Sequence, residues 1–298
     1  MTNFTRRQFI QTGLAGTIVT CAGLSSLIDP DTKEYMIDEV ELGKTGLRLS
    51  RLAFGMGSRG GNHESNQTRM GMNKFIEMMQ YGYDRGVRFF DTADTYGSHA
   101  NVKEALKLIP RESVKIQSKI WLMNSDGIVQ KPIPETLDRF RKEMNTDYID
   151  ILLLHCLTNR NWPHQHARIM DALLEAKEKG IVKKVGISAH NFQAMEIAAD
   201  HEWVDIMLAR INHNGDHMDN TPALVMALLE RAKNNGKGII GMKIFGDGRL
   251  VDEASREKSL NYVIRSGNIH ALTIGMESIE QVKDNVDRIM RIVNDPDS

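Results

Sequence analysis

The sequence has little cysteine and almost no net charge. Only Cys21 and Cys156 occur in 298 residues, too few for a disulfide framework, an all-cysteine zinc site or an iron–sulfur site. The 38 lysines and arginines against 39 aspartates and glutamates give a formal charge of −1. There is therefore no basic excess to neutralise a nucleic-acid backbone, and we expect no nucleic-acid partner.

Charge is also missing from residues 8–28, which follow the run Thr5-Arg6-Arg7-Gln8-Phe9-Ile10. This segment resembles a twin-arginine (Tat) export signal, in which a basic pair precedes a weakly apolar stretch. Glycines and hydroxyl residues make the stretch a poor transmembrane helix. We therefore predict a targeting segment over residues 1–34 that the Tat export machinery binds, and a folded domain over residues 35–298.

This interpretation predicts an exported protein, periplasmic or membrane-associated in a bacterium. The export route carries folded proteins, so it suits a protein that acquires a cofactor before crossing. Three alternatives remain: a basic tail with a chance arginine pair, a lipid-modified Cys21, or an uncleaved anchor.

Beyond residue 35, apolar runs of strand length alternate with amphipathic stretches of helix length. The expected strands are Leu52–Met56, Arg88–Asp91, Lys115–Lys119, Ile149–His155, Lys184–Ser188, Val204–Ile211, Ile239–Ile244 and Ala271–Gly275. The clearest expected helices are Asn73–Arg85, Ile133–Met144, Ile169–Lys179, Ala194–His201 and Pro222–Asn234. Strands that are apolar throughout and alternate with helices imply a parallel sheet covered on both faces.

Eight such units match the size of an α/β fold of the (β/α)8 TIM-barrel type. An open doubly wound sheet is the alternative, but no Gly-x-Gly-x-x-Gly turn follows the first strand. Before that strand, the turn Gly43-Lys44-Thr45-Gly46 lies between two short apolar segments. It predicts a short N-terminal β-hairpin that plugs the bottom of the barrel.

Polar side chains follow three neighbouring strands where a TIM barrel builds its active site, at the carboxyl ends. They are Asp91 and Tyr96 after the second strand, Lys119 at the end of the third and His155 at the end of the fourth. A tyrosine has an ordinary pKa of about 10, which a nearby ammonium lowers.

This set therefore predicts a tyrosine general acid tuned by Lys119, with Asp91 holding the lysine and His155 orienting a substrate oxygen. Such a site needs a hydride donor, and a nicotinamide is the natural one. Each residue alone has an ordinary structural interpretation, as a helix cap, a turn residue, a solvated strand end or a core histidine. The prediction rests on their occurrence together.

The sequence is similar to the aldo-keto reductase family over residues 38–290. The similarity is carried by Leu42-Gly43-Lys44-Thr45-Gly46-Leu47, Phe90-Asp91-Thr92-Ala93-Asp94-Thr95-Tyr96-Gly97, Ser118-Lys119-Ile120-Trp121, Asp147-Tyr148-Ile149-Asp150-Ile151-Leu152-Leu153-Leu154-His155 and Gly180-Ile181-Val182-Lys183-Lys184-Val185-Gly186-Ile187-Ser188. The resemblance implies a catalytic tetrad of Asp91, Tyr96, Lys119 and His155, and NADP(H) or NAD(H) as cofactor.

The resemblance also implies a set of cofactor contacts. They are Gly55, Met56, Asp91, Ser188, Asn212, Lys243, Phe245, Gly246, Gly248, Ser278, Gln281 and Asn285. Three positions depart from the family pattern, because Ala189 replaces an asparagine, Leu208 a glutamine and Ile211 a ring-stacking tyrosine. For Lys243, two alternatives to a cofactor contact stay open: a solvated residue at the end of a strand, or a Schiff-base lysine.

Cofactor choice stays open, because Gly275 and Gln281 stand where NADP-specific members carry lysine and arginine. Glu277 nearby would repel a 2′-phosphate. For the substrate, a small-molecule carbonyl compound, we expect Trp121 and Trp162 to line an apolar pocket wall. An exposed loop is the alternative for Trp162.

We expect no metal, because His213 and His217 lie on a glycine-containing loop that fixes no ligand geometry. We expect Cys156 to be a buried, inert thiol facing away from the barrel mouth. The leading hypothesis is an NAD(P)H-dependent reductase of aldehydes or ketones. The alternative is an exported nicotinamide-binding sensor or accessory subunit with little turnover. The oligomeric state is not predicted.

Overall fold

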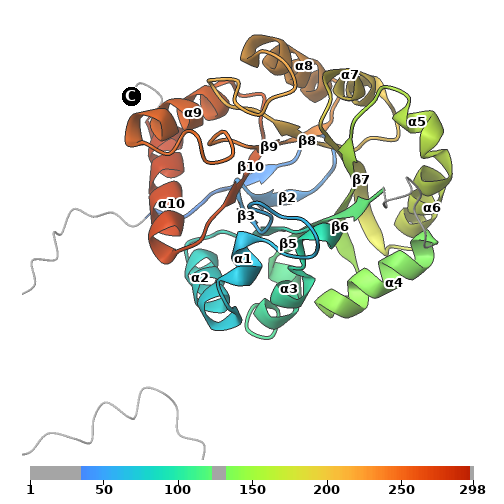
Figure 1. Ribbon diagram of the computed structural model, residues 1–298, viewed down its shortest axis with the longest axis horizontal. Coiled ribbons are helices and arrows are strands. Elements are labelled where there is room, and N and C mark those ends of the chain that lie inside the picture. Colours follow the sequence, from blue (N-terminus) through green and yellow to red (C-terminus); the bar gives the residue numbers. More distant parts are fainter. Residues whose placement is uncertain (1–34, 123–131, 296–298) are drawn as a thin grey trace, which may run out of the picture. The chain divides into compact units, whose positions relative to one another are not determined.

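The computed structural model describes residues 35–122 and 132–295, and the predicted targeting segment lies outside them. Eight parallel strands close into a barrel in chain order, with the last strand pairing back onto the first (Figure 1). The strands are β3 (Leu52–Gly55), β4 (Phe89–Asp91), β5 (Lys115–Trp121), β6 (Ile149–Leu157), β7 (Val182–Ala189), β8 (Ile206–Arg210), β9 (Gly238–Met242) and β10 (Ala271–Gly275). The predicted (β/α)8 barrel is confirmed.

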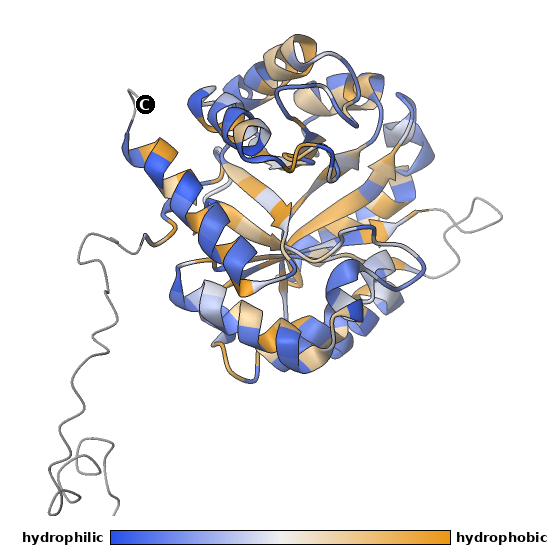
Figure 2. Cartoon of the chain, turned by 60° about the vertical axis from the view of Figure 1, so that its left-hand side comes forward, coloured by the Kyte–Doolittle hydropathy of each residue, from blue (hydrophilic) through white to orange (hydrophobic). Residues whose placement is uncertain are grey.

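Helices surround the barrel and cover its outer surface. The longer ones are α2 (Met72–Asp84), α3 (His99–Ala105), α4 (Ile133–Met144), α6 (Ala167–Glu178), α7 (Phe192–Asp200), α8 (Pro222–Asn234), α9 (Glu253–Arg265) and α10 (Ile279–Asn294). The shorter ones are α1 (Asn66–Arg69), α5 (Trp162–Gln165) and the 3₁₀ turns η1 (Asp94–Tyr96) and η2 (Arg111–Ser113). Figure 2 shows apolar strands inside and polar outer helix faces. Within the described ranges, no helix combines the length and apolar character needed to cross a bilayer.

A two-stranded hairpin precedes the barrel, as predicted. Its strands β1 (Glu39–Glu41) and β2 (Arg48–Ser50) pair antiparallel. Leu42 and Leu49 flank its turn, are buried, and join a cluster with side chains from inside the barrel, among them Phe89 and Ile240. The hairpin therefore fills the barrel interior at its amino-terminal end, which leaves the carboxyl end for chemistry.

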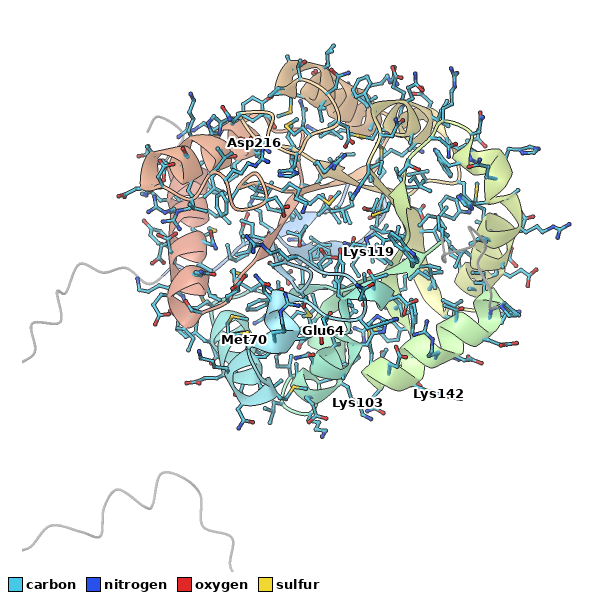
Figure 3. The ribbon with its side chains drawn as sticks, viewed as in Figure 1. Glu64, Met70, Lys103, Lys119, Lys142 and Asp216 are labelled. Atoms are coloured by element: carbon cyan, nitrogen blue, oxygen red, sulfur yellow. The ribbon has the colours of Figure 1, made fainter. Side chains whose placement is uncertain are left out.

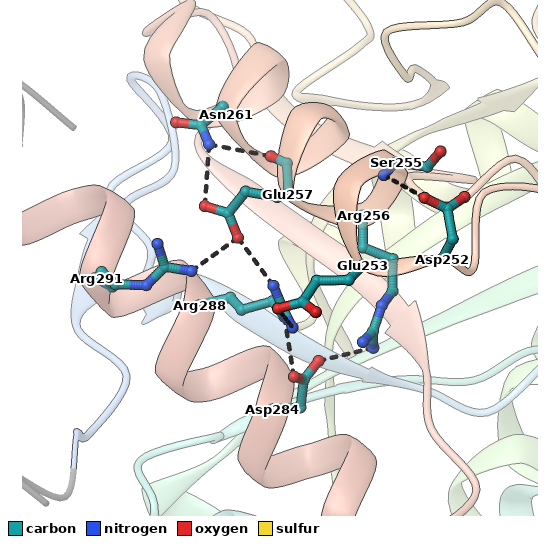
Figure 4. Close-up of polar contacts among 9 residues, drawn as sticks. All are labelled: Asp252, Glu253, Ser255, Arg256, Glu257, Asn261, Asp284, Arg288 and Arg291. Atoms are coloured by element: carbon teal, nitrogen blue, oxygen red, sulfur yellow. Dashed lines mark hydrogen bonds and ion pairs between the residues drawn. The ribbon is translucent and has the colours of Figure 1, made fainter.

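Helices α9 and α10 are joined side by side by a network of charges (Figure 4). Arg288 donates to Asp284 over 2.9 Å and to Glu257 over 3.0 Å. Arg256 donates to the other oxygen of Asp284 over 2.7 Å, and Arg291 to Glu257 over 2.8 Å. Each carboxylate thus accepts from two guanidinium groups, which fixes the two helices that follow β9 and β10.

Candidate active site

Four predicted side chains meet at the carboxyl end of the barrel. Asp91 ends β4, Tyr96 ends η1, and Lys119 and His155 lie near the ends of β5 and β6. The Lys119 Nζ lies 2.5 Å from Asp91 Oδ1 and 4.8 Å from the centre of the Tyr96 ring. The Tyr96 hydroxyl lies 3.5 Å from His155 Nε2. Figure 3 shows Lys119 near the middle of the barrel.

The Asp91 carboxylate is fully hydrogen-bonded. Its Oδ1 accepts from Lys119 and from Gln117 over 2.7 Å, and its Oδ2 accepts from Thr273 over 2.8 Å. Lys119 also donates to the carbonyl of Thr92 over 2.9 Å. Burial opposes the charge on Lys119, but Asp91 and Tyr96 offset it, so the pKa of Lys119 is raised. The ammonium is thus charged and fixed.

Tyr96 keeps its proton more tightly than the sequence predicts. Burial is the largest influence on its phenol and raises the pKa, while the charge of Lys119 lowers it. Asp91 and Cys156 add to the rise. The expected lowering by Lys119 is present, but the net change in the pKa is a rise, because desolvation of the phenolate outweighs the ammonium. A protonated phenol is the form that a general acid requires.

His155 is neutral. Burial, with smaller effects from Lys119 and His190, holds its pKa well below the ordinary value. Its Nε2 faces the Tyr96 hydroxyl, and its Nδ1 has no partner among the described residues. The ring of Trp121 meets it edge to face at 5.4 Å. A neutral imidazole can share a hydrogen bond with a carbonyl oxygen without competing as an acid.

A groove of about 680 Å³ leads away from these side chains across the ends of β3, β9 and β10 to α10. Seven of the predicted cofactor residues line it: Gly55, Asp91, Lys243, Phe245, Gly248, Gln281 and Asn285. Sequence reasoning missed other lining residues, among them Arg59, Asn66, Asp247 and Arg256. They lie on or beside loops that leave the carboxyl ends of the strands, and that position is the signal that could have identified them.

Two of the predicted cofactor residues carry a buried polar atom that has no partner among the described residues. One is the Asn285 Oδ1, which belongs to a groove-lining side chain only 3% exposed. The other is the Ser188 Oγ at the end of β7. Because buried polar groups are nearly always hydrogen-bonded, the unpartnered Asn285 Oδ1 points to a polar ligand in the groove. Ser188 does not line that groove. The residues present therefore fit a dinucleotide.

Asn212 is not free to bind a cofactor, which corrects the prediction. Its Nδ2 donates to the carbonyls of Asp216 over 2.8 Å and Lys243 over 3.1 Å. Its Oδ1 accepts from the backbone of Asn214, Gly215 and Asp216. The side chain is fully buried and folds the turn after β8.

Three further predicted cofactor residues, Met56, Gly246 and Ser278, make hydrogen bonds with backbone groups of the protein. The Met56 N–H donates to the carbonyl of Asp91, and the Gly246 N–H to that of Lys243. The Ser278 Oγ accepts from the Gln281 N–H and caps α10. None of the three lines the groove in the part that the structure describes.

The structure separates the two predicted substrate residues. Trp121 is 40% exposed at the end of β5 and stays a candidate. Trp162 is fully buried in α5, donates to the carbonyl of Ala194 and packs against Trp203. The prediction for Trp162 is wrong, because its ring fills the space between helices outside the barrel.

Cys156 is not fully buried, contrary to expectation. Its backbone has a φ of +59°, and its Sγ lies 3.5 Å and 3.6 Å from the two ring nitrogens of His190. Burial raises its pKa to about 11, although Lys119, Arg210 and Lys243 oppose the rise. The thiol is therefore protonated at neutral pH and unreactive.

Lys243 lines the groove and pairs with Asp247 over 2.5 Å. The pair sets an ammonium beside the groove, where it suits a phosphate better than a Schiff base. Across the described residues, no three His, Cys, Asp or Glu side chains are grouped to hold a metal.

The model of the Aldo/keto reductase family matches residues 51–293. A methylglyoxal reductase from Salmonella typhi is 32% identical over 161 residues, which cover 50% of this chain and 54% of that protein. The match spans 46% to 60% of the length of three curated relatives that are 28% to 32% identical to this chain.

Solved structures show the same fold. An aldo-keto reductase from Bacillus halodurans in its holo form superposes with a TM-score of 0.68 at 20% identity, covering 85% of this chain and 91% of that one. One from Klebsiella pneumoniae, in complex with NADPH, gives 0.63 at 16% identity, covering 86% and 90%.

Proposed function

This chain belongs to the aldo/keto reductase family, and from that premise we propose that it reduces an aldehyde or ketone to an alcohol with NAD(P)H. The observation that carries the proposal is the buried Asp91–Lys119 pair beneath the Tyr96 ring, with His155 beside the hydroxyl. Asp91, Tyr96 and Lys119 line a groove large enough for a dinucleotide.

A nicotinamide cofactor held in the groove by residues such as Gly55, Lys243 and Asn285 would supply the hydride that the carbonyl carbon accepts. Tyr96 donates the proton from its hydroxyl to the carbonyl oxygen, which completes the alcohol. The Lys119 ammonium stabilises the phenolate that remains, and Asp91 keeps that ammonium in place. His155, neutral and 3.5 Å from the hydroxyl, orients the carbonyl oxygen toward it.

Tyr96→Phe tests the mechanism, because it removes the proton and little else. We expect loss of aldehyde reduction by on the order of a thousandfold, with cofactor affinity unchanged when it is measured by fluorescence titration. Trp121→Ala, at the exposed rim, serves as the comparison and should raise KM more than it lowers kcat. Full activity in Tyr96→Phe would contradict the mechanism.

A second candidate is a nicotinamide-binding sensor or accessory subunit. Leu208 lines the groove where the family places a glutamine, and Ile211 replaces the ring-stacking tyrosine, which favours a looser hold on the ring. Single-turnover absorbance of bound NADPH with a panel of aldehydes separates the two. Oxidation by an aldehyde supports the reductase, and none by any carbonyl compound supports the sensor.

We also propose that residues 1–34 direct export through the twin-arginine route, on the strength of Arg6 and Arg7 before an uncharged stretch. Replacing both by lysine in the full chain should keep the protein in the cytoplasmic fraction of a host with that route. Equal distribution of both versions would show that the pair is not a signal.

A further inference from the structure

The turn that carries Tyr96 is held by an arginine from a neighbouring helix. Arg139 on α4 donates from both of its terminal nitrogens to the two carboxylate oxygens of Asp94, each over 2.9 Å. Asp94 begins η1, and Tyr96 ends it. Two parallel hydrogen bonds fix orientation as well as distance, so this ion pair limits rotation of the short turn.

The same arginine belongs to a chain of contacts that ends beside Lys119. Arg139 donates to Glu143 over 3.0 Å, and Glu143 contacts the Nδ1 of His99 at 2.7 Å. The Nε2 of His99 lies 2.9 Å from the hydroxyl of Ser118, the residue before Lys119 in β5. Burial disfavours the Glu143 charge, but its bonds to His99 and Arg139 prevail and lower its pKa.

The other end of the turn is also fastened. The hydroxyls of Thr92 and Ser98 lie 2.6 Å apart and are buried. Gly97 adopts a φ of +68°, and a Cβ there would lie 1.9 Å from the carbonyl oxygen of His63. The turn is thus fixed on both sides of Tyr96, and Arg139 supplies its only bidentate ion pair among the described residues.

We propose that Arg139 is a positioning residue. Its ion pair with Asp94 fixes the position of Tyr96. Its contact with Glu143, and through it with His99, holds that position relative to the strand that carries Lys119. The inference rests on the proposed reductase function. The relative placement of tyrosine and lysine then depends on helix α4, which does not touch the groove. A displacement of about 1 Å at a reacting group costs on the order of a hundredfold in rate.

The test is Arg139→Met, assayed with saturating NADPH and a model aldehyde. We expect kcat to fall about tenfold to a hundredfold and the solvent isotope effect on kcat to rise, because proton transfer from Tyr96 becomes slower. The cofactor dissociation constant, measured by fluorescence, should change less than about twofold, since Arg139 does not line the groove. Arg139→Lys keeps the positive charge but cannot form the bidentate pair, so its kcat should lie between that of the original chain and that of Arg139→Met.

Arg141→Met is the matched control, because Arg141 lies on the same helix and pairs with Asp138 instead. It should leave kcat unchanged. Wild-type kcat in Arg139→Met, or an equal loss in the control, would overturn the proposal. If Arg139→Met does not fold, Asp94→Asn removes the same ion pair from the other side and answers the same question.

A second measurement needs no turnover. The ionisation of Tyr96 is followed by phenolate absorbance during a pH titration. For the original chain and for each variant, the titration of the same protein carrying Tyr96→Phe is subtracted, which leaves the signal of Tyr96 alone. Arg139→Met should displace the midpoint and Arg141→Met should not. Identical midpoints would refute positioning even if no aldehyde is reduced. A displaced midpoint in a protein without any turnover would support positioning and refute only the reductase function.

Discussion

At the scale of single residues, the chemistry of Tyr96 depends on two opposing influences. Burial raises the pKa of the phenol, and the Lys119 ammonium lowers it. Asp91 acts on both sides, because it keeps the lysine charged and also adds to the rise of the phenol pKa. The result is an acid that holds its proton at neutral pH beside a cation ready to stabilise the phenolate.

Lys119→Met removes the positive charge that lowers the pKa of Tyr96, but it leaves the burial that raises this pKa. We therefore expect the pKa of Tyr96 to rise further and reduction to fall by on the order of a hundredfold. Phenolate absorbance, corrected with Tyr96→Phe, measures the shift. Lys183→Met is the control, because Lys183 lies 3.9 Å above the ring of Tyr148, and it should leave the Tyr96 midpoint in place. An unchanged or lower midpoint in Lys119→Met would contradict this account.

The meeting of the four side chains could be predicted from sequence because parallel strands end at one edge of a barrel. The roles of Asn212 and Trp162 could not. A sequence shows that an asparagine follows a strand, but not that its donors and its acceptor are already used by the turn. It shows a tryptophan after β6, but not that the ring turns outward into α7.

At the scale of elements, the eight strands and the helices α2, α4, α6, α7 and α8 were predictable, since each keeps one pattern of burial over its length. The long helices α9 and α10 were not among the helices named from the sequence. The helices α1, α3 and α5 have only four to seven residues, too few to display a helical period. The pairing of α9 with α10 also escaped prediction, because it depends on charges about 30 residues apart, such as Glu257 and Arg288.

Arg288 is the centre of that pairing, with its side chain 13% exposed and bonded to carboxylates on both helices. We expect Arg288→Met to lower the free energy of unfolding by about 1–2 kcal/mol, because charged hydrogen bonds with little exposure are lost. Urea unfolding measures it. Lys179→Met, which breaks an exposed pair with Glu175, should have almost no effect. Equal stabilities of the two variants would show that the network contributes nothing.

At the scale of the whole molecule, the two ends of the barrel have separate tasks. The carboxyl end holds Asp91, Tyr96, Lys119 and His155 beside the groove, together with polar atoms that have no partner among the described residues and a Cys156 backbone at positive φ. The amino end is closed by the apolar hairpin. Apolar packing at the amino end therefore offsets the free-energy cost of the polar groups that lack hydrogen-bond partners at the carboxyl end.

Leu42→Ala tests this division, because the side chain is fully buried where the hairpin plugs the barrel. Truncation leaves a cavity, and we expect the free energy of unfolding to fall by about 3 kcal/mol. Leu224→Ala, at a leucine 51% exposed on α8, should change it by less than about 0.5 kcal/mol. Below the unfolding transition, kcat and cofactor affinity of both variants should equal those of the original chain. A fall in kcat for folded Leu42→Ala would show that packing at the base reaches Tyr96 through the strands, and the two ends would then be coupled.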